Sequence, residues 1–249
     1  MSISINQQVF NSPGFSTDLC LSITELDFIR QAIHSQWLTR ISDVYPHLAP
    51  QFADHGLPNY HQFADSVDHN LLWPKKWRLF SKEIVNTIAE FETIEKLKNE
   101  FGSCSISEIV YDNVVQAGEK EVYWRLVRPN VASDVGPLHA DQWFHNLVDS
   151  GYGMFSPNTK TVKVWIAIYT EPGLNGLMVV PESHSKDWQH TTVMIGGAMK
   201  PCLVDAVEPT LVATEPGRLI IFNDKLLHGG AINSGNLTRV SVEITLVLQ

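Results

Sequence analysis

The chain has 249 residues, of which 44% are hydrophobic and 18% charged, and its formal net charge is −9 at pH 7. These values are typical of a globular protein and exclude an intrinsically disordered chain. The negative charge argues against a nucleic-acid partner, because a phosphate-binding surface needs a positive patch. A small anionic ligand is still compatible with it, since one or two buried arginines can hold an anion inside an acidic protein.

The three cysteines, Cys20, Cys104 and Cys202, are far apart and form no C-x-x-C pair. They predict neither a disulfide framework nor a zinc ribbon, and free thiols fit a reducing compartment. The first ten residues lack the charged and apolar regions of a signal peptide. No apolar run reaches the roughly 18 residues that a membrane span requires. We therefore expect a cytoplasmic protein without a membrane partner.

Residues 1–105 are predicted to be mostly helical. Ser22 and Glu25 match the capping-box pattern at the start of a helix. Apolar residues then recur at helical spacing at Leu26, Ile29, Ile33 and Trp37. Ser81 is expected to cap a second helix, which carries Ile84, Ile88 and Phe91, and a third short helix is expected around Glu95–Glu100.

From residue 106 to 249 the pattern changes to short β-prone runs separated by Gly, Pro, Asn and Asp. The expected strands are 106–115, 122–128, 162–169, 177–180, 191–195, 210–213, 218–222 and 239–248. About eight strands with little helix between them predict a closed or double-sheet β architecture. We expect residues 1–249 to form a single domain whose helical part, 1–105, covers one sheet of the β core, 106–249.

Two of these strands have faces of different character. In 239–248, alternation places Arg239, Ser241, Glu243 and Thr245 on one face and the apolar residues on the other. In 162–169, it places Lys163, Trp165, Ala167 and Tyr169 opposite an apolar face. The apolar faces can pack on the helical layer, so the polar faces are predicted to line a pocket inside the barrel.

His139 and Asp141, together with His228, have the composition of an iron(II) facial triad. Two imidazoles and one carboxylate occupy one face of an octahedron and leave three positions for substrates and oxygen. Taken singly, each histidine is more readily explained as a hydrogen-bonded structural residue. Arg239 and Ser241, which follow on a β-prone segment, make the metal site the leading interpretation.

Arg239 and Ser241 are suited to bind a second carboxylate. The planar guanidinium can hold a carboxylate through two hydrogen bonds, and a hydroxyl on the same strand face can add a third. A ligand with a carboxylate at one end and a 2-oxo acid at the other would reach from Arg239 to the metal, which describes 2-oxoglutarate. The alternative is an internal ion pair of Arg239 with Glu243 or Asp224.

Three segments together resemble the phytanoyl-CoA dioxygenase family of Fe(II)- and 2-oxoglutarate-dependent oxygenases: GPLHADQW, VKVWIAIYTEPGLNGLMVVPESHS and LLHGGAINSGNLTRVSV. The resemblance covers about residues 123–247. It implies a mainly β double-stranded β-helix, a jelly-roll, cupin-like fold. It also implies iron bound by His139, Asp141 and His228, and 2-oxoglutarate bound by Arg239 beside Trp165. Glu182 replaces the usual glycine of the loop before His184, and we do not expect His184 to bind metal.

The resemblance also implies the reaction. Related halogenases have a small residue in place of the iron-binding carboxylate, whereas this chain keeps Asp141. We therefore expect hydroxylation of an unactivated C–H bond, with consumption of O2 and release of succinate and CO2. Ascorbate is expected to help in vitro. Two alternatives remain: a metal-dependent cupin-like enzyme that does not use 2-oxoglutarate, and a non-catalytic binding protein on the same fold.

The substrate is expected to be a small free metabolite, because the chain leaves little room for a coenzyme A site. Candidate substrate-binding residues are Trp124, Arg125, Arg128, Trp143, Phe144 and His145. Arg125 and Arg128 cannot face the same side of a regular strand, since they are three residues apart. The loop 146–161 is a candidate lid. No protein partner is indicated, and the oligomeric state is left open.

Overall fold

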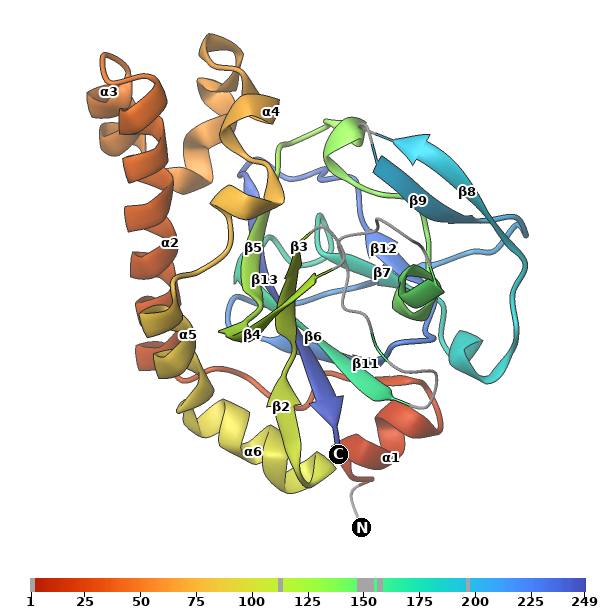
Figure 1. The fold of residues 1–249 in the computed structure, drawn as a ribbon. Helices are drawn as coiled ribbons and strands as arrows, with labels where there is room; N and C mark the ends of the chain where they lie inside the picture. The colour runs from red at the N-terminus through yellow and green to blue at the C-terminus, as the bar shows by residue number, and fades with distance from the viewer. Residues whose placement is uncertain (1–2, 112–113, 147–154, 156–158, 196–197) are drawn as a thin grey trace.

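A computed structural model describes residues 3–111, 114–146, 155, 159–195 and 198–249. Its N-terminal part is helical and its C-terminal part is built of antiparallel strands (Figure 1). The α-helices are α1 Ile5–Phe10, α2 Ile23–Val44, α3 Ala49–His55, α4 His69–Leu72, α5 Lys82–Ala89 and α6 Glu92–Phe101. No helix among these described residues is long and apolar enough to cross a membrane.

The larger sheet has the strand order β1-β11-β6-β13-β2, and β5 also pairs with β13. Its strands are β1 Phe15–Ser16, β2 Cys104–Ile106, β5 Val122–Val127, β6 Lys160–Tyr169, β11 Leu219–Asn223 and β13 Arg239–Leu248. The smaller sheet, β10-β7-β12, consists of Thr210–Val212, Leu177–Val179 and His228–Gly230. These two antiparallel sheets form the cupin-like double-stranded β-helix that the sequence predicted.

Two hairpins complete the β part. One joins β3 Glu108–Tyr111 to β4 Val114–Lys120, and the other joins β8 His190–Ile195 to β9 Ala198–Leu203. The single strand expected over 106–115 is therefore wrong. Ile106 pairs with β13 as the end of β2, and the chain then leaves the large sheet, so that β3 pairs with its own hairpin partner instead.

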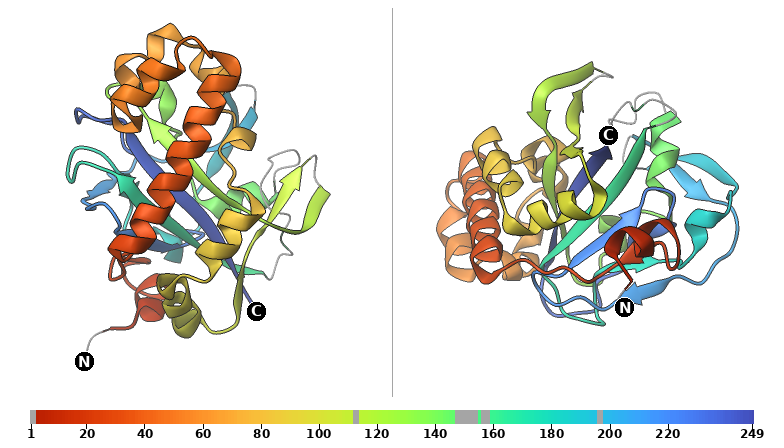
Figure 2. Two further views of the ribbon diagram at one scale, coloured as in Figure 1. Left: turned by 90° about the vertical axis from the view of Figure 1, so that its left-hand side faces the viewer. Right: turned by 90° about the horizontal axis from the view of Figure 1, so that it is seen from below.

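The helical layer covers the outer face of the large sheet. Figure 2 (left) shows α2 lying across the strands. One hydrophobic core joins the two parts, with Leu26, Ile29, Ile33 and Trp37 from α2 and Val162, Val164, Ile166, Val240, Val242 and Ile244 from the sheet. These are the apolar faces that alternation predicted. The polar faces of β6 and β13 therefore point toward the small sheet.

Local sequence signals explain most of the helix boundaries. Ser22 and Glu25 form the predicted capping box: the Ser22 hydroxyl accepts from Glu25 N at 3.2 Å, and the Glu25 carboxylate accepts from Ser22 N at 2.7 Å. Ser81 is the N-cap residue of α5. The third helix starts earlier than expected, at Glu92, because α5 already ends at Ala89 and Phe91 takes the extended N-cap conformation of α6.

Tyr169 does not line the barrel, contrary to the alternation pattern. The pairing of β6 with β13 is irregular: Val240 lies opposite Tyr169, but Ser241 lies opposite Ala167. This bulge reverses the alternation at the end of β6. Tyr169 consequently packs on the helical side, where the Arg30 guanidinium lies 4.9 Å from the centre of its ring.

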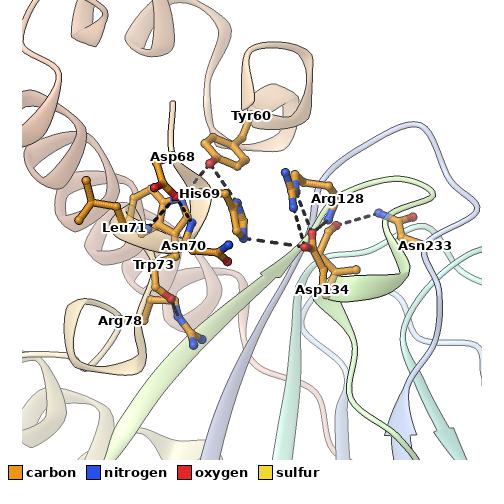
Figure 3. A network of polar contacts seen from close by, with 11 residues as sticks. Tyr60, Asp68, His69, Asn70, Leu71, Trp73, Arg78, Arg128, Asp134 and Asn233 are labelled. Atoms are coloured by element: carbon orange, nitrogen blue, oxygen red, sulfur yellow. Dashed lines mark hydrogen bonds and ion pairs between the residues drawn. The ribbon is translucent and has the colours of Figure 1, made fainter. Parts of the chain in front are cut away.

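A polar network joins the helical layer to the barrel (Figure 3). The Tyr60 hydroxyl contacts His69 Nδ1 at 3.1 Å and accepts from Trp73 Nε1 at 3.0 Å. On the barrel side, Arg128 donates from Nε and Nη2 to the two carboxylate oxygens of Asp134 at 2.9 and 2.8 Å. His69 Nε2 lies 3.9 Å from the same carboxylate. The network therefore ties α4 to the segment that leads to His139.

His69 is expected to make the protein less stable in mild acid. Burial, followed by the charge of Arg128, lowers the pKa of His69 from 6.5 to about 4, although Asp134 opposes this shift. The unfolded chain then binds more protons between these two pH values, so stability is complete above pH 6.5 and falls as the pH decreases toward 4. We expect a loss of about 1–2 kcal/mol in the free energy of unfolding.

Urea unfolding between pH 7.5 and 4.5 measures this effect. The variant His69→Gln is expected to show a flatter pH dependence over that range. The control His47→Gln changes an exposed histidine and should keep the wild-type slope. An unchanged slope in His69→Gln would contradict the assignment.

Candidate metal centre

The two histidines of the predicted triad lie side by side on paired backbone. His139 N donates to His228 O at 3.0 Å and His228 N donates to His139 O at 2.9 Å, which forms an antiparallel bridge. The centres of the two imidazole rings are 4.5 Å apart. Gly229 follows directly, where a Cβ atom would come within 3.3 Å of Leu138, so the absence of a side chain lets the two segments approach closely.

In both imidazoles Nδ1 contacts a backbone carbonyl, and Nε2 is directed toward Asp141. His139 Nδ1 lies 2.8 Å from Pro137 O, and His228 Nδ1 lies 2.9 Å from Leu226 O. A carbonyl oxygen can only accept a hydrogen bond, so Nδ1 carries the proton and the lone pair of Nε2 is available. This is the arrangement in which protein histidines bind metal ions.

Asp141 brings its carboxylate to these Nε2 atoms from the start of a short 3-10 helix, Asp141–Asn146. Its Oδ1 is 3.8 Å from His139 Nε2 and its Oδ2 is 3.6 Å from His228 Nε2. The ligand atoms of the three residues all lie within 4.8 Å of one another. Among the described residues, the buried Oδ2 accepts no hydrogen bond. The donor set and its geometry fit a divalent metal ion of the facial-triad type.

The charge states of the site also suit a metal ion. Burial alone would raise the pKa of Asp141, but the positive charge of Lys163, followed by the imidazoles of His228 and His139, holds it well below its usual range. Burial and the neighbouring His228 lower the pKa of His139 to about 4. At neutral pH the site therefore offers an ionised carboxylate and a neutral His139, the forms that bind metals.

A cavity beside the triad lies between the two sheets. Side chains from both sheets line it: Arg125, Lys163, Trp165, Leu177, Phe222, Arg239 and Glu243. Arg239 is 3% exposed, and its Nη1 donates to Gly176 O at 2.7 Å. Within the described part of the chain, Arg239 Nε and Ser241 Oγ are buried without a hydrogen-bond partner.

The alternative ion pair of Arg239 with Glu243 or Asp224 does not form among the described residues. Glu243 instead pairs with Arg125, whose Nε is 2.8 Å from Glu243 Oε1, and accepts a hydrogen bond from the Tyr123 hydroxyl. The Asp224 carboxylate accepts from Thr161 Oγ1 at 2.8 Å. Burial, followed by the charge of Arg125, lowers the pKa of Arg239 to about 10, so Arg239 remains a buried cation. Its surroundings favour an anionic ligand.

The phytanoyl-CoA dioxygenase (PhyH) family model matches residues 59–241. The chain belongs to this family. The oxygenase is therefore a non-haem iron enzyme by family, and the His139, Asp141 and His228 cluster is its candidate iron site. No curated protein matches the oxygenase.

Solved structures show the same fold at low sequence identity. The oxygenase is similar to the non-heme monooxygenase ThoJ in its apo form, with 13% identity and a TM-score of 0.59, over 98% of this chain and 77% of that one. It is also similar to EctD from S. alaskensis with 2-oxoglutarate and 5-hydroxyectoine, with 14% identity and a TM-score of 0.56, over 99% and 76%. The iron-bound form of EctD gives 14% identity and a TM-score of 0.54, over 99% and 77%.

Asn175 and Gly176 of the oxygenase support Arg239 rather than the metal. Gly176 has a φ of 139°, and an added Cβ would come within 3.3 Å of Val212 O. Asn175 is fully buried and donates to Asn233 Oδ1 at 3.0 Å. This anchoring fixes the carbonyl group that accepts from Arg239. Asn175 and Gly176 therefore have a structural function in the cavity.

The glycine that the family usually has in the loop before His184 has a clear physical explanation. Glu182 has a φ of 64°, in the left-handed region that glycine occupies most easily. In the oxygenase, Glu182 N donates to Pro13 O at 2.7 Å and its carboxylate accepts from Ser12 Oγ at 2.8 Å. These contacts stabilise the loop without the glycine. His184 packs against Gly14 and lies outside the cluster formed by His139, Asp141 and His228.

Three of the candidate substrate residues, Trp124, Arg125 and Arg128, lie on or directly after β5 and point to different sides. Arg125 lines the cavity of the oxygenase. Trp124 points to the opposite side, where it is fully buried in the main core and donates from Nε1 to Gln36 at 2.9 Å. Arg128 is also directed away from the cavity and pairs with Asp134. Trp124 and Arg128 are therefore corrected to structural residues, because strand alternation separates them from Arg125.

The aromatic residues Trp143 and Phe144, which follow Asp141, make ring contacts with histidines. The Phe144 ring lies edge-on to His139, with 5.2 Å between ring centres. Trp143 stacks on His190 of β8 at 4.3 Å. Trp165 lines the cavity, and the Arg239 guanidinium lies 5.8 Å from the centre of its ring. The side chain of His145 and most of the candidate lid 146–161 lie outside the described residues.

The sequence did not identify Lys163 and Glu243 as site residues, although alternation placed both on inward faces. In the oxygenase they line the same cavity as the triad. A charged residue on the inward face of a barrel strand was the available signal. This signal is not specific, because only the fold shows which inward positions lie beside the metal ligands.

Proposed function

We propose that the protein is an Fe(II)- and 2-oxoglutarate-dependent oxygenase that hydroxylates an unactivated C–H bond of a small-molecule metabolite. The reaction consumes O2 and releases succinate and CO2. The observation that carries the proposal is the buried Arg239 guanidinium, which has no carboxylate partner among the described residues and lines the same cavity as the triad. A dicarboxylate with a 2-oxo group would bind the metal at one end of this cavity and Arg239 at the other.

In this proposal His139, Asp141 and His228 hold the iron. Arg239 and Ser241 bind the distal carboxylate, and Trp165 packs beside it. When bound, the iron and 2-oxoglutarate supply the activation of O2. The protein positions both in the cavity between the two sheets. Asp141 keeps a coordination position that a halide would need, which supports hydroxylation rather than halogenation.

We assign the substrate to the side of the cavity occupied by Arg125, and we keep Trp143, Phe144 and His145 as further candidate substrate contacts on the evidence of the sequence. Arg125 is held by Glu243 and its side chain is 36% exposed, so it is the cavity cation best able to meet a polar group of a substrate. We propose a free metabolite rather than a coenzyme A ester, and a cytoplasmic location.

The test begins with an anaerobic titration of the protein with Mn(II) and then 2-oxoglutarate. We expect 2-oxoglutarate to bind tightly only when metal is present. With Fe(II), O2 and ascorbate, the protein should slowly form succinate without substrate, and a substrate screen should then find compounds that accelerate this release. Metal binding without any 2-oxoglutarate binding would favour a cupin-like enzyme, and a lack of both would favour a non-catalytic protein.

A further inference from the structure

Lys163 is a buried lysine beside the metal-binding carboxylate. It lies on the inward face of β6, opposite Thr245 of β13 and Phe222 of β11, and is 6% exposed. Its Nζ donates to Thr245 Oγ1 at 2.7 Å. The same Nζ lies 3.6 Å from Asp141 Oδ2, the oxygen that faces His228.

Packing does not require an ammonium group at this position. Trp165 and Ala167 follow on the same face of β6 and belong to the smaller hydrophobic core. An unbranched apolar side chain such as methionine could fill the space that Lys163 occupies. Burying a charge is costly unless a partner compensates it. One such partner is Asp141, which is itself a candidate metal ligand.

The position of Lys163 gives it two opposite electrostatic effects. Its charge holds the Asp141 carboxylate in place beside the imidazoles. A divalent cation bound to Asp141, however, would lie close to the ammonium group, and the two would repel each other. The same positive charge would attract an anion bound at the metal. Both effects are strong because the group is shielded from water.

We propose that Lys163 is a positioning residue of the metal centre that lowers the affinity for the divalent cation and strengthens binding of the anionic cosubstrate. The inference rests on the proposed function, since it concerns the same metal ion and 2-oxoglutarate. Thr245 fixes the ammonium group at this distance, and Arg239 binds the opposite end of the cosubstrate. The bound dianion then has a positively charged side chain of the protein near each of its ends.

The test uses Lys163→Met, which keeps an unbranched stem without the charge. Its matched control is Lys160→Met, because Lys160 is an exposed lysine at the start of the same strand. Mn(II) affinity is measured without oxygen from the paramagnetic resonance signal of the free ion. The affinity of the Mn(II)-saturated protein for 2-oxoglutarate is measured by calorimetry.

We expect Lys163→Met to bind Mn(II) about 10-fold more tightly and 2-oxoglutarate about 10-fold more weakly, given the strength of charge interactions at a few ångströms in a buried site. Lys160→Met should match the wild type in both measurements. Lys163→Arg keeps the charge and should move both affinities back toward the wild-type values.

A general loss of structure would weaken both affinities, so opposite shifts cannot arise from misfolding. If Lys163→Met binds Mn(II) no more tightly than the wild type, or binds 2-oxoglutarate equally well, the inference is overturned. If the wild-type protein itself binds neither Mn(II) nor 2-oxoglutarate, the proposed function fails instead.

Discussion

Asp141→Asn is expected to abolish metal binding and succinate formation. The substitution keeps the shape of the side chain but removes the negative charge that compensates a divalent cation. It also leaves Lys163 facing a neutral group, 3.6 Å from the former carboxylate position. We expect Mn(II) affinity to fall by at least about 100-fold. Mutation of residues that only hydrogen-bond to metal ligands already lowers metal affinity by up to about 100-fold, and loss of a ligand should cost more. His139→Ala and His228→Ala are expected to abolish turnover as well.

The matched control is Asp187→Asn, which makes the same change at an exposed position. Mn(II) binding by paramagnetic resonance and succinate release with Fe(II) should both match the wild type in this control. Circular dichroism shows whether Asp141→Asn remains folded. A folded Asp141→Asn protein that binds Mn(II) with wild-type affinity would exclude Asp141 as a ligand and with it the facial triad.

Arg239→Met should raise the concentration of 2-oxoglutarate needed for half-maximal binding by about 100-fold, equivalent to about 3 kcal/mol. The reason is the loss of two charge-assisted hydrogen bonds inside a buried cavity. Arg239→Lys is expected to be intermediate, because lysine keeps the charge but lacks the planar two-pronged donor. Calorimetry on the Mn(II)-loaded protein measures all three affinities.

Measuring Mn(II) affinity distinguishes a loss of the contact with 2-oxoglutarate from general damage to the site. The triad residues lie on other segments, so Arg239→Met should retain Mn(II) binding while 2-oxoglutarate binding is weakened. Arg218→Met is the control, since Arg218 donates to Thr17 O and does not line the cavity. Equal 2-oxoglutarate affinity in Arg239→Met and the wild type would show that the cosubstrate does not bind at Arg239.

Periodicity predicted the main features of the fold because burial is regular along these segments. The alternation in β13 correctly separated Val240 and Val242, which pack on the helices, from Arg239 on the cavity side. It failed at Tyr169, where a bulge changes the register. A bulge depends on which strand lies alongside, and sequence periodicity within one strand does not contain that information.

The sequence by itself determined the chemical identity of the candidate site. The capacity of His139, Asp141 and His228 to bind a metal ion follows from their residue types. The positive charge of Arg239 likewise follows from its residue type, wherever it lies in the fold. The family motifs can also be read from the sequence alone, and the family match covers residues 59–241.

Only the tertiary structure decided which neighbouring charges act on these residues. It showed that Arg125 pairs with Glu243, that Arg128 pairs with Asp134 away from the cavity, and that Lys163 lies beside Asp141. Electrostatic interactions depend on distance and burial. These quantities follow from the pairing of β5, β6 and β13, strands far apart in the sequence, and so they appear only once the chain is folded.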